Sequence, residues 1–268
     1  MNMASYISPD DYRVSGEMNA LYWGFGILAF ILLFITAISV GIITLSVVVG
    51  TAILVWIQQS QLVGGCAKVS ENQFPDIYAI AIEAARRLSM HQPEIFIRQN
   101  PTLNAFAIGF LGTKSVVLHS ATVEAMDRNE LEHIIGHEFS HIKCGHTNLT
   151  VLTSSSQGIN VPIISQILSF VFLVWSRKAE YTCDRGGLIA TRDLKAGIAA
   201  MCKLAVGATL FKQMDVEDFL NQQMDIDQND VTRLSEGLAT HPYLVKRIRA
   251  IQQFSETDQY KGLAAKSP

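Results

Sequence analysis

The chain has 268 residues, of which 49% are hydrophobic and 17% charged, so a disordered or fibrous protein is excluded. Its mean hydropathy of +0.24 is high for a soluble enzyme, and we expect part of the chain to lie in lipid. With 21 basic and 24 acidic residues the formal net charge is −3, which gives no basic footprint for nucleic acid. The four cysteines are scattered, as is typical of free thiols in a reducing compartment, and we expect a catalytic domain on the cytoplasmic side.

The first long feature is an apolar stretch without any charged residue from Met18 to Ala67. A single helix over its most apolar part would measure roughly 55 Å, whereas the hydrocarbon core of a bilayer is about 30 Å thick. We therefore predict a transmembrane helical hairpin over residues 20–58, with a turn near Ser39 to Gly41, in the inner or plasma membrane. An N-terminal arm (1–19) precedes it, on the same side as the remainder. The alternative is a pair of buried helices in a soluble bundle.

Residues 68–256 have the pattern of one α+β domain, mainly helical, with a small antiparallel sheet. We predict a helix over Pro75–Arg87 and strands over Glu94–Arg98, 105–110 and 115–118. A capping box at Asp127 and Glu130 opens the next helix. Later helices are expected near 177–190, near 195–206 and after residue 242. The apolar segment 159–175 is expected to be an interfacial or buried helix, with a third membrane span as the alternative. Residues 257–268 are expected to be a C-terminal tail.

The most informative segment is His137-Glu138-Phe139-Ser140-His141, an HExxH sequence within the capped helix. Residues four apart share one helical face, so both imidazoles can bind one metal ion, while the glutamate reaches the adjacent water. A catalytic zinc site needs a third protein ligand and an open position for that water. The motif therefore predicts a zinc-dependent hydrolase, provided that a third ligand exists.

The third ligand is open among His133, Cys144, His146, Cys183, His241 and a downstream carboxylate. His133 lies one turn too far along the helix to complete a tetrahedron, so a packing or outer-shell role is expected. Glu180 is the strongest candidate, because Asp184 follows four residues later on the same predicted helix. The pair could offer a ligand and a carboxylate that orients a ligating histidine.

Four segments together resemble the HtpX and CAAX prenyl protease family of membrane-bound gluzincin metallopeptidases. They are Asn104-Ala105-Phe106-Ala107, the HExxH sequence, Glu180 with Asp184, and Thr240-His241-Pro242 followed by Arg247-Ile248. Their order and approximate spacing match the family over roughly residues 77–251, and the hairpin in front resembles the HtpX branch. One departure is Cys183, where alanine is common in the family.

The resemblance implies a zincin-type domain with one Zn²⁺, held by His137, His141 and Glu180. It also implies that Glu138 is the catalytic base and that Asp184 supports a ligand from behind. Asn104, Ala105, Phe106 and Ala107 would bind the main chain of a protein or peptide substrate, and His241 would help to polarise it. Zinc would supply the activated water, and Glu138 would take its proton.

The leading hypothesis is a membrane-anchored zinc endopeptidase that acts on damaged or misfolded membrane proteins. A processing protease for lipid-attached C-termini and a proteolytically silent zinc-binding scaffold are the alternatives.

Residues 225–236 imitate a calcium loop but have Asp230 where the loop needs glycine, so a mobile acidic lid or spacer is expected instead.

Overall fold

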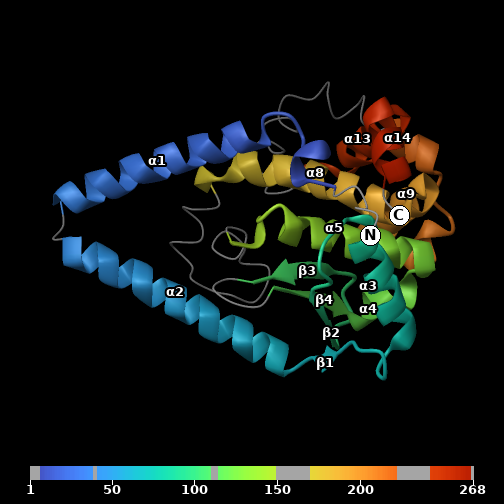
Figure 1. Cartoon of the computed structure of the whole chain (residues 1–268), viewed down its shortest axis with the longest axis horizontal. Coiled ribbons are helices and arrows are strands. Elements are labelled where there is room, and N and C mark those ends of the chain that lie inside the picture. Colours follow the sequence, from blue (N-terminus) through green and yellow to red (C-terminus); the bar gives the residue numbers. More distant parts are fainter. Residues whose placement is uncertain (1–6, 39–40, 110–113, 149–169, 222–241, 267–268) are drawn as a thin grey trace, which may run out of the picture.

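The structure is a computed structural model, and it describes residues 7–38, 41–109, 114–148, 170–221 and 242–266 (Figure 1). Four predictions from the sequence fall wholly or largely outside these ranges. They concern the hairpin turn near residue 39, the segment 159–175, the calcium-like segment 225–236, and His241.

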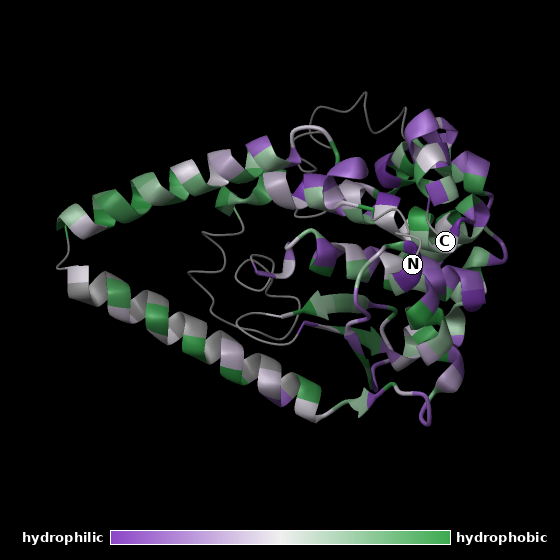
Figure 2. Cartoon of the chain, viewed as in Figure 1, coloured by the Kyte–Doolittle hydropathy of each residue, from purple (hydrophilic) through white to green (hydrophobic). Residues whose placement is uncertain are grey.

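The two apolar helices, α1 (Glu17–Ile38) and α2 (Gly41–Gly64), project away from the rest of the protein (Figure 1). Figure 2 shows mainly hydrophobic residues along α1 and a mixture of hydrophobic and less hydrophobic residues along α2. Large apolar side chains on them are exposed, among them Trp23, Phe30 and Leu33 on α1 and Trp56 on α2. In the described part of the chain one helix, α1, has the length and hydropathy of a membrane span.

The sheet has four strands in the order β1-β2-β4-β3, and it is mixed. Strands β1 (Ala67–Lys68) and β2 (Glu94–Arg98) are antiparallel, as are β3 (Ala105–Ile108) and β4 (Ser115–His119), but β2 and β4 are parallel. The prediction of an antiparallel sheet was therefore wrong for the central pair. The physical reason is that β3 takes the outer edge, so β4 returns to lie beside β2 in the same direction.

The helices lie close to their predicted positions. Helix α3 (Pro75–Arg87) has the predicted bounds, and the capping box of Asp127 and Glu130 is formed at the start of α5 (Arg128–Lys143). The further α-helices of the described residues are α4 (Ser120–Ala125), α8 (Leu173–Thr191), α9 (Leu194–Val206), α10 (Ala208–Phe211), α13 (Leu244–Glu256) and α14 (Asp258–Lys266). The segment separated as a tail from residue 257 thus forms α14, which buries Leu263 in the core.

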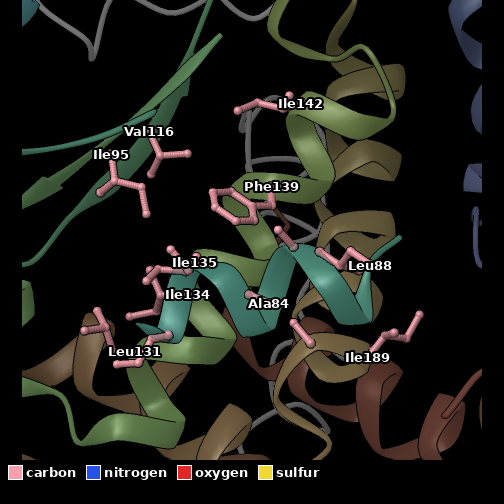
Figure 3. Packing of buried hydrophobic residues seen from close by; sticks show 14 of the residues in the cluster. Ala84, Leu88, Ile95, Val116, Leu131, Ile134, Ile135, Phe139, Ile142 and Ile189 are labelled. Atoms are coloured by element: carbon pink, nitrogen blue, oxygen red, sulfur yellow. The ribbon is translucent and has the colours of Figure 1, made fainter. Parts of the chain in front are cut away.

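Helix α5 is the centre of the core. Figure 3 shows its apolar side chains between α3, the sheet and α8; those labelled from α5 are Leu131, Ile134, Ile135, Phe139 and Ile142. Phe139 and Ile135 are fully buried. At about 25 cal/mol per Å² of apolar surface, each such side chain contributes roughly 1.5–3 kcal/mol. The helix that carries the HExxH sequence is therefore held rigidly.

Helices α5 and α8 approach each other closely because glycines face the contact. A Cβ added to Gly136 would lie 2.3 Å from Cβ of Ala190 and 3.2 Å from Cα of Gly187. A Cβ added to Gly186 would lie 1.7 Å from Oγ of Ser140. No side chain fits at such distances, so the two helices can be this close only while these positions stay glycine.

The N-terminal residues are part of the same core. Ile7 and Tyr12 are fully buried, and the short 3₁₀ helix η1 (Pro9–Asp11) lies between them. The backbone N–H of Val14 donates to Oγ1 of Thr182 in α8 at 3.1 Å. The chain therefore leaves the domain into α1 only after it has packed against α8.

We expect Gly136→Ala to destabilise the protein by about 1–3 kcal/mol, because the added methyl group must push α5 and α8 apart. Chemical denaturation in detergent measures the change. Gly262→Ala is the matched control, since nothing lies within 4 Å of a Cβ there and alanine favours a helix. Equal stability of the Gly136→Ala variant and the wild type would contradict the glycine contact.

Candidate active site

One face of α5 brings His137 and His141 together. Their Nε2 atoms are 3.2 Å apart, and the ring centroids are 5.0 Å apart. Glu138, between them in the sequence, is buried, and its negative charge acts on the His141 imidazole. The helical spacing thus produces the juxtaposition that the sequence predicted.

Helix α8 brings Glu180 to the same point. Its Oε1 lies 3.5 Å from Nε2 of His141, and its Oε2 lies 3.8 Å from Nε2 of His137. Glu180 is 39 residues beyond His141 (180 − 141), and the glycine contact between the helices closes that separation. Both imidazoles and the downstream carboxylate therefore form one cluster.

The donor set fits a zinc ion by geometry and by charge. With bonds of 2.0–2.1 Å, two donors of a tetrahedral zinc site are about 3.3 Å apart, and the distances between the three groups are close to that. Three carboxylates, of Glu138, Glu180 and Asp184, are buried at the site, and among the described residues Arg247 contacts two of them, Glu180 and Asp184. When they are ionised the net charge is −2, which a divalent cation neutralises.

Cys183 offers a second possible third ligand. Its Sγ and one nitrogen of each of the two histidines lie within 4.8 Å of one another. However, Sγ also lies 3.4 Å from Nδ1 of His146, which in turn is 3.3 Å from Nδ1 of His141. The thiol is thus in contact with His146, whereas the Glu180 oxygens lie 3.5 and 3.8 Å from the Nε2 atoms of His141 and His137. We prefer Glu180, because its oxygens face the atoms at which the two imidazoles meet.

Asp184, one helical turn after Glu180 on α8, orients the imidazole ring of His137. Its Oδ1 is 3.0 Å from Nδ1 of His137, so it can accept that N–H and leave Nε2 free for a metal. Arg247 of α13 donates to both Asp184 oxygens, at 2.6 and 2.8 Å. Burial disfavours the charged carboxylate, but Arg247 and His137 outweigh it and hold the pKa of Asp184 well below its usual value.

Arg247 is a functional residue whose role the sequence analysis missed. Its Nη1 also lies 3.0 Å from Oε2 of Glu180, so one guanidinium holds both carboxylates of α8. The signal was present, because Arg247 belongs to one of the four segments that carry the family resemblance. What the sequence could not give is its target, since 63 residues separate it from Asp184.

Two of the other histidine and cysteine candidates are not placed as ligands. His133 packs against the backbone of Gly187 and Gly197, and its ring nitrogens have no hydrogen-bond partner among the described residues. Burial lowers the pKa of His133 to about 4, which keeps it neutral. Burial raises the pKa of Cys144 to about 11, and its Sγ lies 3.7 Å from the hydroxyl of Tyr12.

The segment expected to bind substrate forms the start of β3, which lies beside α5 (Figure 1). Asn104 turns its side chain to its own strand, where Oδ1 accepts the N–H of Ala105 at 2.9 Å. Phe106 and Ala107 are buried on opposite faces of the sheet. His241, the expected oxyanion donor, lies outside the described residues, so its position stays a prediction.

Two histidines one helical turn apart, a glutamate beside the first and a carboxylate from another helix define the donor set of a metal-dependent hydrolase. The model of "Peptidase family M48" matches residues 71–169 and 155–255. The chain belongs to this family of metallopeptidases, as the resemblance indicated.

Characterised relatives agree with this family. The chain is 31% identical over 216 residues to the plastoglobule-localized metallopeptidase 48 of Arabidopsis thaliana, over 75% of this chain and 63% of that protein. It therefore spans less than two thirds of the plant protein. It is 26% identical to HtpX protease homologues of Helicobacter pylori (225 residues, 70% of this chain and 69% of theirs) and Streptococcus uberis (241 residues, 73% and 80%).

We expect Arg247→Met to weaken zinc binding by about 10- to 100-fold, because Glu180 and Asp184 lose the group that orients them. It should also destabilise the protein by about 3–5 kcal/mol, since the buried carboxylates lose their counter-ion. Arg247→Lys keeps one charge but cannot hold both carboxylates, so an intermediate effect is expected. Metal competition with a chromogenic chelator and chemical denaturation measure both effects.

Arg249→Met is the matched control on the same helix, because Arg249 donates to the backbone oxygen of Leu220 rather than to the metal site. A similar loss of zinc affinity in both arginine variants would show that Arg247 acts through general stability.

Proposed function

We propose that the protein is a membrane-anchored, zinc-dependent endopeptidase. The observation that carries this is the convergence of His137, His141 and Glu180 within 3.2–3.8 Å, with Glu138 buried beside them. A purely structural zinc site has no use for a carboxylate beside an open position, so the presence of Glu138 favours a catalytic site. Membership of peptidase family M48 supports the reaction class.

In this proposal Glu138 is the general base. It accepts a proton from the attacking water and returns it to the leaving amine of the cleaved peptide bond. When bound, zinc would lower the pKa of a coordinated water to about 7 and polarise the scissile carbonyl. Asp184 and Arg247 hold His137 and Glu180 in place. On the family resemblance, His241 donates to the developing oxyanion.

Strand β3 is the proposed docking site for the substrate main chain. It is one of the two edge strands of the described sheet, and α5 lies beside it. The N–H of His119 donates to the carbonyl of Asn104, which fixes the alternation of the hydrogen bonds between β3 and β4. The backbone groups of Phe106 therefore point to β4, whereas those of Ala107 point outward, as does the carbonyl of Ala105, whose N–H donates to Asn104. Addition of a peptide there would use main-chain hydrogen bonds, which tolerate many sequences.

The hairpin topology is supported by where the two apolar helices begin and end. Helix α1 starts at Glu17, which is 1% exposed and lies in the domain, and α2 leads into β1, which pairs with β2 of the sheet. Because both outer ends are fixed to the same domain, a span by α1 requires a return by α2. Exposed apolar side chains on both helices would be covered by lipid.

The proposed substrates are misfolded or damaged membrane proteins, and the proposed location is the inner or plasma membrane with the domain on the cytoplasmic side. The relatives named as HtpX protease homologues support the protease activity, and the substrate class is proposed from the family resemblance and from the exposed apolar helices. The buried free cysteines are consistent with a reducing compartment.

We expect Glu138→Gln to retain zinc and to lose cleavage of unfolded casein by at least about 100-fold, as removal of a general base does. Chelator-sensitive digestion and metal analysis on the same sample measure the two properties. Glu132→Gln is the matched control, because Glu132 is also a buried glutamate of α5 but pairs with Arg87 at 3.4 Å. Cleavage by the Glu138→Gln variant at the wild-type rate would contradict the proposal, and zinc without cleavage in the wild type would indicate a silent scaffold.

Ala107→Pro tests the edge strand. Proline removes the outward N–H without breaking the bonds between β3 and β4, so KM should rise several-fold while the fold is retained. Ala107→Gly keeps the N–H and serves as the control. Steady-state cleavage of an unstructured peptide gives KM and kcat. An unchanged KM in the proline variant would exclude the outward N–H from substrate binding.

A further inference from the structure

A row of hydrogen-bonded side chains connects His141, the second imidazole proposed to bind the metal, to the first residue of α1. Nδ1 of His141 lies 3.3 Å from Nδ1 of His146, and Nε2 of His146 lies 2.8 Å from Oε1 of Glu17. All three residues are buried, with exposed fractions of 8%, 1% and 1%. Glu17 is the first residue of α1, 129 positions from His146.

The proton positions along this row of side chains follow once the metal-binding nitrogen of His141 is chosen. If Nε2 of His141 is a metal ligand, its proton is on Nδ1, which donates to Nδ1 of His146. His146 then carries its own proton on Nε2 and donates it to the Glu17 carboxylate. The N–H groups of His141 and His146 then each have an acceptor. His137 has the simpler version of this arrangement, in which Nδ1 donates directly to Asp184.

Surrounding groups hold the chain in place. Thr182 of α8 donates its hydroxyl to Oε2 of Glu17, and Nε of Arg13 lies 3.2 Å from Oε1. The Trp175 ring packs edge-on against the His146 ring, with centroids 5.6 Å apart, and the thiol of Cys183 lies 3.4 Å from Nδ1 of His146. Glu17 is therefore oriented by groups from both the N-terminal arm and α8.

We propose that Glu17 and His146 are positioning residues for the zinc ligand His141, an arrangement called the relay below. Through this relay, zinc affinity depends on how the N-terminal arm and the first turn of α1 pack against the domain. This inference rests on the proposed role of His141. Carboxylates that orient a ligating histidine typically change metal affinity 10- to 100-fold, and here the effect is relayed by one intervening imidazole. No local pattern indicated that Glu17 pairs with His146, because Glu17 precedes the entire apolar stretch.

The test measures zinc affinity of the full chain in detergent, by competition with a chromogenic chelator, and the visible absorption of the Co²⁺-loaded protein. Glu17→Ala and His146→Ala should each lower zinc affinity by about 10- to 100-fold and change the cobalt spectrum. Glu17→Gln keeps an acceptor oxygen and should recover most of the affinity. The double variant should be no worse than His146→Ala alone, because Glu17 acts through His146.

Glu130→Gln is the matched control. Glu130 is also a buried glutamate in an ion pair, to Nζ of Lys203 at 2.6 Å, but it caps the opposite end of α5. It should leave the cobalt spectrum unchanged. If the Glu17 and His146 variants bind zinc as the wild type does, or if their losses add in the double variant, the relay is wrong.

The two proposals fail in different ways. A wild-type protein that cleaves casein, with relay variants that keep full zinc affinity, would overturn the relay and leave the peptidase intact. A wild-type protein that binds zinc and loses it in the relay variants, but never cleaves, would overturn the peptidase and leave the relay intact. Should His146→Ala fail to fold, the comparison of Glu17→Ala with Glu17→Gln still decides the question.

Discussion

The structure depends on the close approach of α5 and α8, which glycines make possible. Gly136 and Gly186 leave no space for a side chain at the crossing, and Ser140 and Ala190 fill the space opposite. This contact is what brings Glu180 and Asp184 of α8 to the histidines of α5. The ligand atoms must lie within a few tenths of an ångström of the positions that a metal ion requires. A methyl group added between α5 and α8 would move the helices apart and displace these atoms.

The second constraint is electrostatic. Several carboxylates are buried around the two imidazoles, and each buried charge needs a partner. Arg247 neutralises part of that charge and fixes the direction of Glu180 and Asp184 together. The remaining negative charge makes the cluster suited to a divalent cation. If the cluster binds a metal as proposed, metal binding and folding would be coupled through the same groups.

The packing of residues 7–17 joins these constraints to the first apolar helix, α1. Tyr12 lies in the core, and the N–H of Val14 and the Glu17 carboxylate both contact Thr182. Helix α1, which is proposed to enter the bilayer, thus begins with Glu17, the residue proposed to position His141 through His146. The two apolar helices are therefore joined to the domain at fixed points, α1 through Glu17 and α2 through β1.

The sequence by itself determined the local features. Helical spacing put His137 and His141 on one face, a capping box started α5 at Asp127, and short runs of residues that favour β-structure predicted the three longer strands. Each of these depends on interactions within a few residues, which is why they could be predicted. Family resemblance added the expectation that Glu180 and Asp184 act with them. Only the tertiary structure decided that β2 and β4 run parallel, that Arg247 holds both carboxylates, and that Glu17 lies behind His146. Those pairings join residues far apart in the chain, and they arise from how the helices and strands pack, which no local pattern specifies.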